Sequence, residues 1–314
     1  MAGNDLKVLS IYDHVSCVKK LTHSSGETVQ LQLDYHRLIV AGCGAMGLPM
    51  AKALINAGFT TACYDVESLQ DQLPGEYILD SLKDLDSKDI LFIVVRDFQQ
   101  IREICFEKEK VFNNPQHPEK LIICSTISPL QILELKGLLP EDVELIDAPM
   151  SGAPVAAEEK TLTFMIGGDK ELVENLHPVF EAMGKSMFHI GPISHGMSAK
   201  VLNNYMAACS VVSVRMGLHH AARLGIDNAT LLDVVQRSSG QNWFASNIDK
   251  IDWAHEVYGQ DNTIGILEKD VLAAIDAMRD TSPDNDNFSK ENSTGEKFGN
   301  AIIEALRQIP SIPD

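Results

Sequence analysis

Short apolar runs and segments of helical periodicity alternate over most of the first two thirds of the chain. The runs expected to form strands are residues 38–41, 60–64, 90–95, 121–124, 143–146 and 161–167. Strands separated by helical segments are typical of a parallel sheet that has helices on both faces. The pattern therefore predicts an α/β domain with a doubly wound parallel sheet.

The pattern changes near residue 195. Between residues 196 and 225, apolar side chains recur at steps of three and four, which predicts one long helix. No strand pattern follows it, so residues 195–314 are expected to form an all-α domain. Within that domain, residues 281–297 are polar and rich in helix breakers, which predicts a divergent loop before a short helix at 298–308.

The first 36 residues precede this α/β pattern and look like an added element. Residues 28–34 alternate between apolar and polar positions, as a half-buried strand does. We interpret 1–36 as an N-terminal extension, either a short appended strand or a remnant of a fused domain. The nucleotide-binding part would then span 37–194.

Composition narrows the classes of partner. The net charge of −18 argues against nucleic acid or an anionic membrane as a partner, and an anionic cofactor would have to be held by local donors. The six cysteines are scattered without metal-ligand spacing, so neither disulfides nor a metal site is expected. Without an apolar leader or an apolar run of 18 residues, a cytoplasmic location is expected.

A glycine-rich turn follows the first apolar run of the α/β part. It reads Gly42-Cys43-Gly44-Ala45-Met46-Gly47 and leads into a helical segment. The three glycines suit a tight turn, a close approach of backbone to a pyrophosphate, and close helix–strand packing. This order predicts a Rossmann-type dinucleotide-binding unit, and a purely structural β-turn-α corner is the alternative.

Asp65 ends the second predicted strand, 23 positions after Gly42. An acid here accepts hydrogen bonds from a ribose 2′-hydroxyl and repels a 2′-phosphate. No arginine or lysine occurs between Lys52 and Lys83. The charge pattern therefore favours NAD over NADP, although a turn-forming aspartate would look the same.

Lys200, Asn203 and Asn204 fall within one turn of the long predicted helix. A partly desolvated lysine can protonate a carbonyl, and an amide can both donate to and accept from a hydroxy acid. The spacing fits such a site, and it fits equally a solvated lysine beside two ordinary asparagines.

Five segments, taken in order, resemble the β-hydroxyacid dehydrogenase family of the 6-phosphogluconate dehydrogenase superfamily. They are GCGAMGLPMAKAL, CSTISP, DAPMSGAPVAAEEKTLTFMIGG, GPISHGMSAKVLNN and LEKD, between residues 42 and 270. The resemblance implies an NAD-dependent oxidoreductase that transfers hydride to or from a small 3-hydroxy acid. The acids expected are of the 3-hydroxyisobutyrate, tartronate semialdehyde/glycerate or L-threonate type.

The resemblance also implies a role for each matching residue. Lys200 corresponds to the catalytic acid/base, and the substrate would be bound by Ser125, Ser151, Gly152 and Asn204. The cofactor would be bound by Gly42, Gly44, Ala45, Met46, Gly47, Asp65, Val95, Thr126 and Lys269. For Lys269, an exposed helix lysine paired with a neighbouring acid is the alternative.

The chain also departs from the family pattern. Ala153 and Ser194 stand where glycine is common, and Arg96-Asp97 replaces an apolar loop near the expected adenosine site. Two other functions stay open: a non-catalytic nucleotide-binding scaffold, and an imine or semialdehyde reductase that uses NADPH. Trp243 and Phe244 are either pocket walls or core aromatics.

A homo-oligomer, dimer or tetramer, is expected from the long helix. It carries small residues that allow another helix to approach closely, namely Ala207, Ala208, Ser210 and Gly217. Packing within one chain is the alternative use of these residues.

Overall fold

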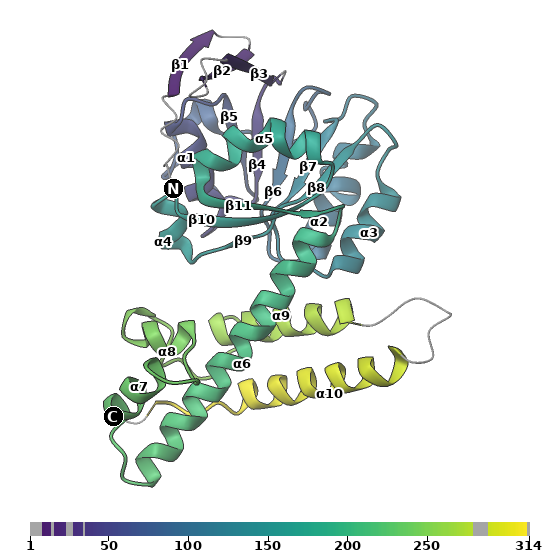
Figure 1. Ribbon diagram of the computed structural model, residues 1–314. Helices are drawn as coiled ribbons and strands as arrows, with labels where there is room; N and C mark the ends of the chain where they lie inside the picture. Colours follow the sequence, from purple (N-terminus) through teal and green to yellow (C-terminus); the bar gives the residue numbers. More distant parts are fainter. Residues whose placement is uncertain (1–7, 14–15, 23–27, 34, 279–287, 313–314) are drawn as a thin grey trace. The chain divides into compact units, whose positions relative to one another are not determined.

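The computed structural model describes residues 8–13, 16–22, 28–33, 35–278 and 288–312 (Figure 1). The chain forms two compact units. Unit 1 comprises Met1–Thr126 and Gln131–Met197, and unit 2 comprises Ile127–Leu130 and Ser198–Asp314.

Unit 1 is built on an eight-stranded sheet in the order β11-β10-β8-β7-β6-β4-β5, with β9 beside β10. The strands are β4 (Leu38–Ala41), β5 (Thr61–Tyr64), β6 (Ile90–Ile93), β7 (Lys120–Ile123), β8 (Glu144–Asp147), β9 (Met150–Ser151), β10 (Leu162–Gly167) and β11 (Gly184–Gly191). All six predicted strands are present. The sheet is mostly parallel, as expected, and β10 runs antiparallel to β8 and β9 at one edge.

The central strands are buried on both faces. Every residue of β4 and β6 is buried, which explains why their sequences are continuous apolar runs rather than alternating ones. Helices α1 (Gly47–Asn56) and α5 (Lys170–Met183) pack over one face, which Figure 1 shows in front of the strands. The other helices of the sheet region are α2 (Phe98–Arg102), η2 (Glu103–Glu107), α3 (Pro129–Leu138) and α4 (Pro154–Glu158), with short turns η1 (Gly75–Tyr77) and η3 (Val111–Asn113).

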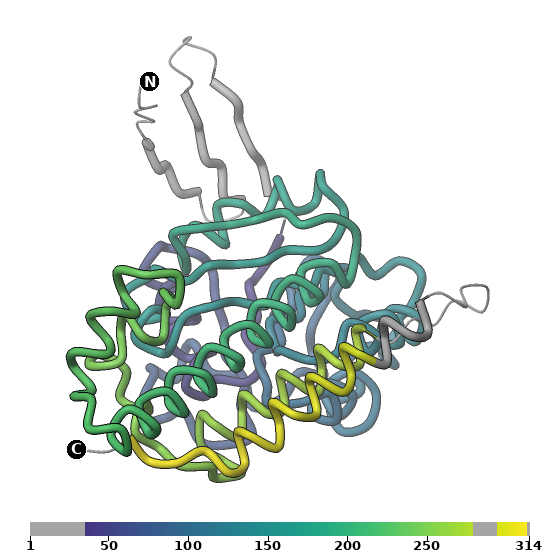
Figure 2. Tube along the Cα trace, turned by 60° about the horizontal axis from the view of Figure 1, so that its bottom comes forward, coloured from purple at the N-terminus to yellow at the C-terminus, as the bar shows by residue number. Residues whose placement is uncertain are grey.

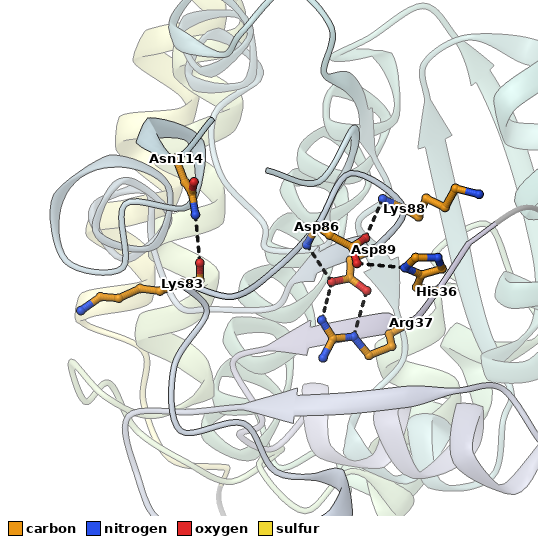
Figure 3. A network of polar contacts seen from close by, with 7 residues as sticks. All are labelled: His36, Arg37, Lys83, Asp86, Lys88, Asp89 and Asn114. Atoms are coloured by element: carbon orange, nitrogen blue, oxygen red, sulfur yellow. Dashed lines mark hydrogen bonds and ion pairs between the residues drawn. The ribbon is translucent and has the colours of Figure 1, made fainter. Parts of the chain in front are cut away.

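An ion pair fixes the amino ends of β4 and β6 (Figure 3). Arg37 precedes β4 and donates from Nε and Nη2 to the two carboxylate oxygens of Asp89, at 2.9 and 2.6 Å. Asp89 precedes β6, is completely buried, and also accepts from the Asp86 N–H at 3.1 Å. Because the Asp89 carboxylate accepts from both Arg37 and Asp86, it holds the amino ends of β4 and β6 in register. The position of the glycine-rich turn, at the other end of β4, is thereby fixed as well.

The N-terminal segment forms a separate three-stranded antiparallel sheet. Its strands are β1 (Val8–Asp13), β2 (Ser16–Thr22) and β3 (Thr28–Leu33), in that order. The predicted strand at 28–34 corresponds to β3, and Asp34 lies outside the described residues. The first two strands were not predicted.

Unit 2 is helical throughout its described part, as expected. Its helices are α6 (His195–Arg223, which begins in unit 1), α7 (Asn228–Gln236), α8 (Trp243–Asn247), η4 (Ile248–Lys250), α9 (Thr263–Met278) and α10 (Phe288–Arg307). The long helix predicted for 196–225 is α6. Phe244 belongs to the core of this unit and stacks on Trp253, whereas Trp243 is exposed. No helix in the described part of the chain has the length and apolar character needed to cross a membrane.

The sequence prediction was wrong for α10, which begins at Phe288 rather than at residue 298. The first part of the expected loop, 281–287, lies outside the described residues. Helices α9 and α10 run side by side (Figure 2), and a Cβ on Gly299 would lie 2.6 Å from Ile275 Cγ1. This close packing stabilises a helix whose serine, asparagine and glycine content disfavours it in isolation.

One arginine is completely buried in unit 2. Arg215 of α6 donates from Nη1 to the carbonyl oxygen of Glu256 and from Nη2 to that of Pro310. Burial lowers the pKa of its guanidinium. The arginine thereby joins α6 to the loop before α9 and to the segment after α10.

Candidate functional site

The glycine-rich turn lies at the carboxyl end of β4. Gly42 has φ +92°, and a Cβ there would collide with the carbonyl oxygen of Val94 and lie 2.8 Å from Val95 Cγ1. A Cβ on Gly47 would collide with the carbonyl oxygen of Gly42. Both positions therefore require glycine, because the turn is pressed between the end of β6 and the start of α1.

Gly44, in contrast, faces open space. A Cβ at this position would meet no atom within 4 Å. In the part of the chain that the structure describes, the N–H groups of Gly44, Ala45 and Met46 enter none of the hydrogen bonds. An open approach beside unpaired donors at a helix N-terminus fits the diphosphate of a dinucleotide.

Asp65 follows β5 and contacts the glycine-rich turn directly. Its carboxylate accepts from the N–H of Cys43 at 2.5 Å and from that of Glu67 at 3.0 Å. The second bond is the turn-forming contact that the sequence left open as an alternative. Each oxygen keeps a lone pair for a further donor, so this local role is compatible with binding a ribose hydroxyl.

Ser125 and Thr126, which follow β7 after Cys124, differ in how their side chains are placed. Ser125 is buried, and its Oγ accepts from the Val95 N–H at 2.8 Å and lies 3.4 Å from the carbonyl oxygen of Ile93. The hydroxyl of Ser125 thus joins the ends of β6 and β7, whereas Thr126 is half-buried. Contacts of Ser125 with substrate, and of Val95 and Thr126 with cofactor, stay predictions.

The loop predicted to receive a carboxylate begins at the end of β9. Ser151 pairs with Thr163 of β10, and Gly152 follows with φ +132°. A Cβ on Gly152 would lie 2.7 Å from Ala156 Cβ and 3.0 Å from Leu162 Cδ2. Only glycine fits there, and Ser151 beside it is half-buried. Their role in binding substrate stays a prediction.

Lys200 lies on α6 in unit 2 and is 7% exposed. Burial lowers the pKa of its ammonium group, the charge of Lys269 lowers it further, and the charge of Asp270 raises it. The alternative of a solvated surface lysine is therefore wrong. A lysine whose charged form is disfavoured by burial is suited to exchange a proton with an alcohol or carbonyl.

Asn204, one turn after Lys200, is held by a carboxylate. Its Nδ2 donates to Asp270 Oδ2 of α9 at 2.6 Å, and its Oδ1 accepts from Asn203 Nδ2 at 3.1 Å. Burial raises the pKa of Asp270. Its other carboxylate oxygen, Oδ1, is buried without a hydrogen bond and lies 3.8 Å from Lys269 Nζ. The cluster therefore contains a buried carboxylate oxygen that can accept a further hydrogen bond.

Sequence reasoning missed Asp270 because only the preceding lysine carried a predicted role. The sequence did contain a signal for Asp270. It shares the buried face of α9 with Leu267, Val271 and Ala274, where an acidic residue is unexpected. Lys269 contacts this acid, which is the pairing left open for it. Its predicted contact with a cofactor is untested.

Asp147 is a second residue that sequence reasoning missed. It ends β8, is completely buried, and accepts from the N–H groups of Ser194 at 2.7 Å and Met197 at 2.5 Å. Burial raises the pKa of Asp147 to about 6 against these bonds. A Cβ on Gly167 would collide with its Oδ1, and Gly196 is equally confined. Asp147 thus caps the first turn of the helix that carries Lys200.

Comparison with known proteins identifies the family. Residues 37–191 match the NAD binding domain of 6-phosphogluconate dehydrogenase, and residues 194–283 match the NAD-binding domain of NADP-dependent 3-hydroxyisobutyrate dehydrogenase. Together the two matches cover more than half of the chain. The chain belongs to the β-hydroxyacid dehydrogenase family. It is accordingly an NAD(P)-dependent oxidoreductase of the 3-hydroxyacid dehydrogenase type.

Individual β-hydroxyacid dehydrogenases resemble the chain at moderate identity. An NAD-dependent L-serine dehydrogenase of Pseudomonas aeruginosa is 32% identical over 64% of this chain and 70% of its own length. A 3-hydroxyisobutyrate dehydrogenase of the same organism is 30% identical over the same shares. A Mycobacterium tuberculosis 3-hydroxyisobutyrate dehydrogenase, solved with L-serine, aligns with a TM-score of 0.67 and 25% identity over 86% of this chain and 99% of its own.

Proposed function

We propose that this chain is an NAD-dependent dehydrogenase that interconverts a small 3-hydroxy acid and its semialdehyde or keto acid, with Lys200 as general acid/base. The observation that carries the proposal is the burial of Lys200, which lowers the pKa of its ammonium group beside the Asn204–Asp270 pair. The substrate class includes acids of the 3-hydroxyisobutyrate, glycerate and L-threonate types. L-Serine belongs to the same chemical class.

Lys200 would move one proton at the reacting oxygen of the substrate. In the oxidation the neutral amine takes the hydroxyl proton, and in the reduction the ammonium group returns a proton to the carbonyl oxygen. Asn204 would hold that part of the substrate through its amide, which Asp270 keeps in one orientation. Ser151 and Gly152 would bind the carboxylate through hydroxyl and backbone N–H donors.

Dinucleotide binding is assigned to the glycine-rich turn. The donors of Gly44, Ala45 and Met46 would hold the diphosphate, and Asp65 would accept from the ribose 2′-hydroxyl. The bound dinucleotide supplies or accepts the hydride. NAD is preferred over NADP because the carboxylate of Asp65 repels a 2′-phosphate.

Steady-state assays of the purified protein test this function directly. The panel contains 3-hydroxyisobutyrate, glycerate, L-threonate, L-serine and two 2-hydroxy acids as controls, each with NAD and with NADP. We expect reduced cofactor to form with at least one 3-hydroxy acid and with neither 2-hydroxy acid. Binding of NADH without turnover of any acid would favour the non-catalytic scaffold instead.

A further inference from the structure

At the carboxyl edge of the sheet in unit 1, the segments that follow the three strands around the glycine-rich turn contain one basic residue. Strands β4, β5 and β6 end in register, with Ala41 opposite both Tyr64 and Ile93. The segments that follow these strands, residues 42–49, 65–72 and 94–101, contain Arg96 as their single arginine or lysine. They also contain several acids, and the chain as a whole carries a charge of −18.

The backbone around Arg96 is fixed against the turn. The Val94 N–H donates to the Ala41 carbonyl oxygen at 2.8 Å, and the Val95 N–H donates to Ser125 Oγ at 2.8 Å. These two valines are the residues that confine Gly42. The Arg96 N–H itself donates to Gln100 Oε1 at 2.8 Å. Arg96 is therefore the first exposed residue after a segment that touches the glycine-rich turn.

The strand order decides which part of a dinucleotide Arg96 adjoins. Strand β4 lies between β5 and β6, so Asp65 after β5 and Arg96 after β6 flank the turn on opposite sides. An acid in the position of Asp65 binds the ribose 2′-hydroxyl, and the diphosphate lies over the glycine-rich turn. Arg96 thus stands on the side of the turn opposite Asp65 and away from the 2′-hydroxyl, and not beside the adenosine as the family pattern suggested.

We propose that Arg96 binds the diphosphate of the dinucleotide through its guanidinium group, and that this residue offsets the unfavourable charge of the chain at the cofactor site. A guanidinium group forms charge-assisted hydrogen bonds with phosphate oxygens. The unpaired N–H groups of the turn bind the same diphosphate from the backbone. This inference rests on the proposed function, because it presupposes that a dinucleotide binds to unit 1.

The test is isothermal titration calorimetry with four ligands: ADP, adenosine, NADH and NADPH. The proteins compared are wild type, Arg96→Gln, Arg96→Lys and the matched control Lys52→Gln. Lys52 is exposed on α1, so its replacement changes the net charge equally. We expect Arg96→Gln to weaken binding of ADP, NADH and NADPH about tenfold each and to leave adenosine binding unchanged. Arg96→Lys should retain part of the affinity, and Lys52→Gln all of it.

Three results would overturn the proposal. Equal ADP affinity in wild type and Arg96→Gln would show that Arg96 does not contact the diphosphate, with the proposed function intact. A loss confined to NADPH would show that Arg96 reads a 2′-phosphate. Failure of the wild type to bind any of the nucleotides would refute both this proposal and the proposed function. Thermal melting of each variant without ligand confirms that the fold is unchanged.

Discussion

Asn204 and Asp270 join helices α6 and α9 through a 2.6 Å hydrogen bond, one helical turn after Lys200. The acceptor is a buried carboxylate whose second oxygen has no hydrogen bond. The charge of Asp270 raises the pKa of Lys200 while burial lowers it. Asp270 therefore has two effects: it orients the amide of Asn204 and it raises the pKa of Lys200.

Replacing Asp270 with Asn should separate these two effects. The amide oxygen of Asn can still accept from Asn204, but the negative charge that raises the pKa of Lys200 is gone. Without that charge the pKa of Lys200 falls, so its amine stays neutral down to a lower pH. In the pH profile of kcat/KM for oxidation, we therefore expect the limb that reports Lys200 to move to lower pH. An unchanged limb, with a normal melting temperature, would show that Asp270 does not influence Lys200.

Lys200→Ala should lower kcat by at least about 10²-fold, the low end for a positioned proton donor. Binding of NADH should persist, because the dinucleotide is assigned to unit 1. Lys200→Arg is the matched variant: it keeps a positive charge but does not release a proton near neutral pH, so it should be equally inactive. Near-normal turnover in either variant, measured under saturating substrate, would remove Lys200 from the mechanism.

Asp65 should make NAD the preferred cofactor. We expect a higher kcat/KM with NAD than with NADP in the wild type, and a smaller ratio in Asp65→Asn, because the amide no longer repels a 2′-phosphate. The contacts of Asp65 with Cys43 and Glu67 also hold the turn, so affinity for both cofactors should fall somewhat. A wild type that prefers NADP would contradict this assignment.

Asp147 should make stability depend on pH in mildly acidic solution. Burial raises its pKa from 3.8 to about 6 in the folded state, so the folded state binds the proton more tightly than the unfolded state does. This contribution is fully present below about pH 4 and is lost as the pH rises through 6. Two pKa units correspond to about 3 kcal/mol. The hydrogen bonds from Met197 and Ser194 oppose the shift, as does an electrostatic interaction with His195.

Urea unfolding of wild type and Asp147→Asn between pH 4 and 7 measures this contribution. The variant does not titrate at residue 147, so the free energy of unfolding of the wild type minus that of the variant should decrease as the pH rises. A difference that is constant over this range would mean that the hydrogen bonds from Ser194 and Met197 outweigh burial and keep the pKa near its ordinary value.

The protein should be a dimer or tetramer that uses α6. This helix exposes three large apolar side chains, Leu202, Met206 and Met216, and the exposed Leu224 follows directly after it. A Cβ on Gly217 would touch nothing, which leaves room for a neighbouring helix, whereas Ala208 is buried within unit 2 and already packs inside the chain. Light scattering should give a mass that is a multiple of 34.5 kDa. Met216→Glu should lower that mass, and a fully active wild-type species near 34.5 kDa would contradict the prediction.

The sequence was most informative where a single period or motif determines the structure. The strand at Leu38–Ala41 was predicted to the residue, and α6 to within two residues, because a continuous apolar run and a long apolar stripe have few alternatives. Strand β11 was missed because it lies at the edge of the sheet, where half of its residues are exposed and only Gly184 is buried. The early start of α10 depends on packing against α9, and the partnership of Asn204 with Asp270 joins residues 66 positions apart. The local sequence pattern predicts neither the start of α10 nor this hydrogen bond.

Arg215 has a practical consequence for producing the protein. Its buried guanidinium depends on the carbonyl oxygen of Pro310 as one of two acceptors. A shortened version that ends before residue 309 would remove that acceptor and leave a desolvated cation in the middle of α6. Expression designs should therefore keep residues 309–312 and place any affinity tag beyond them, since the same truncation also removes Ile309 and Ile312 from the core of unit 2.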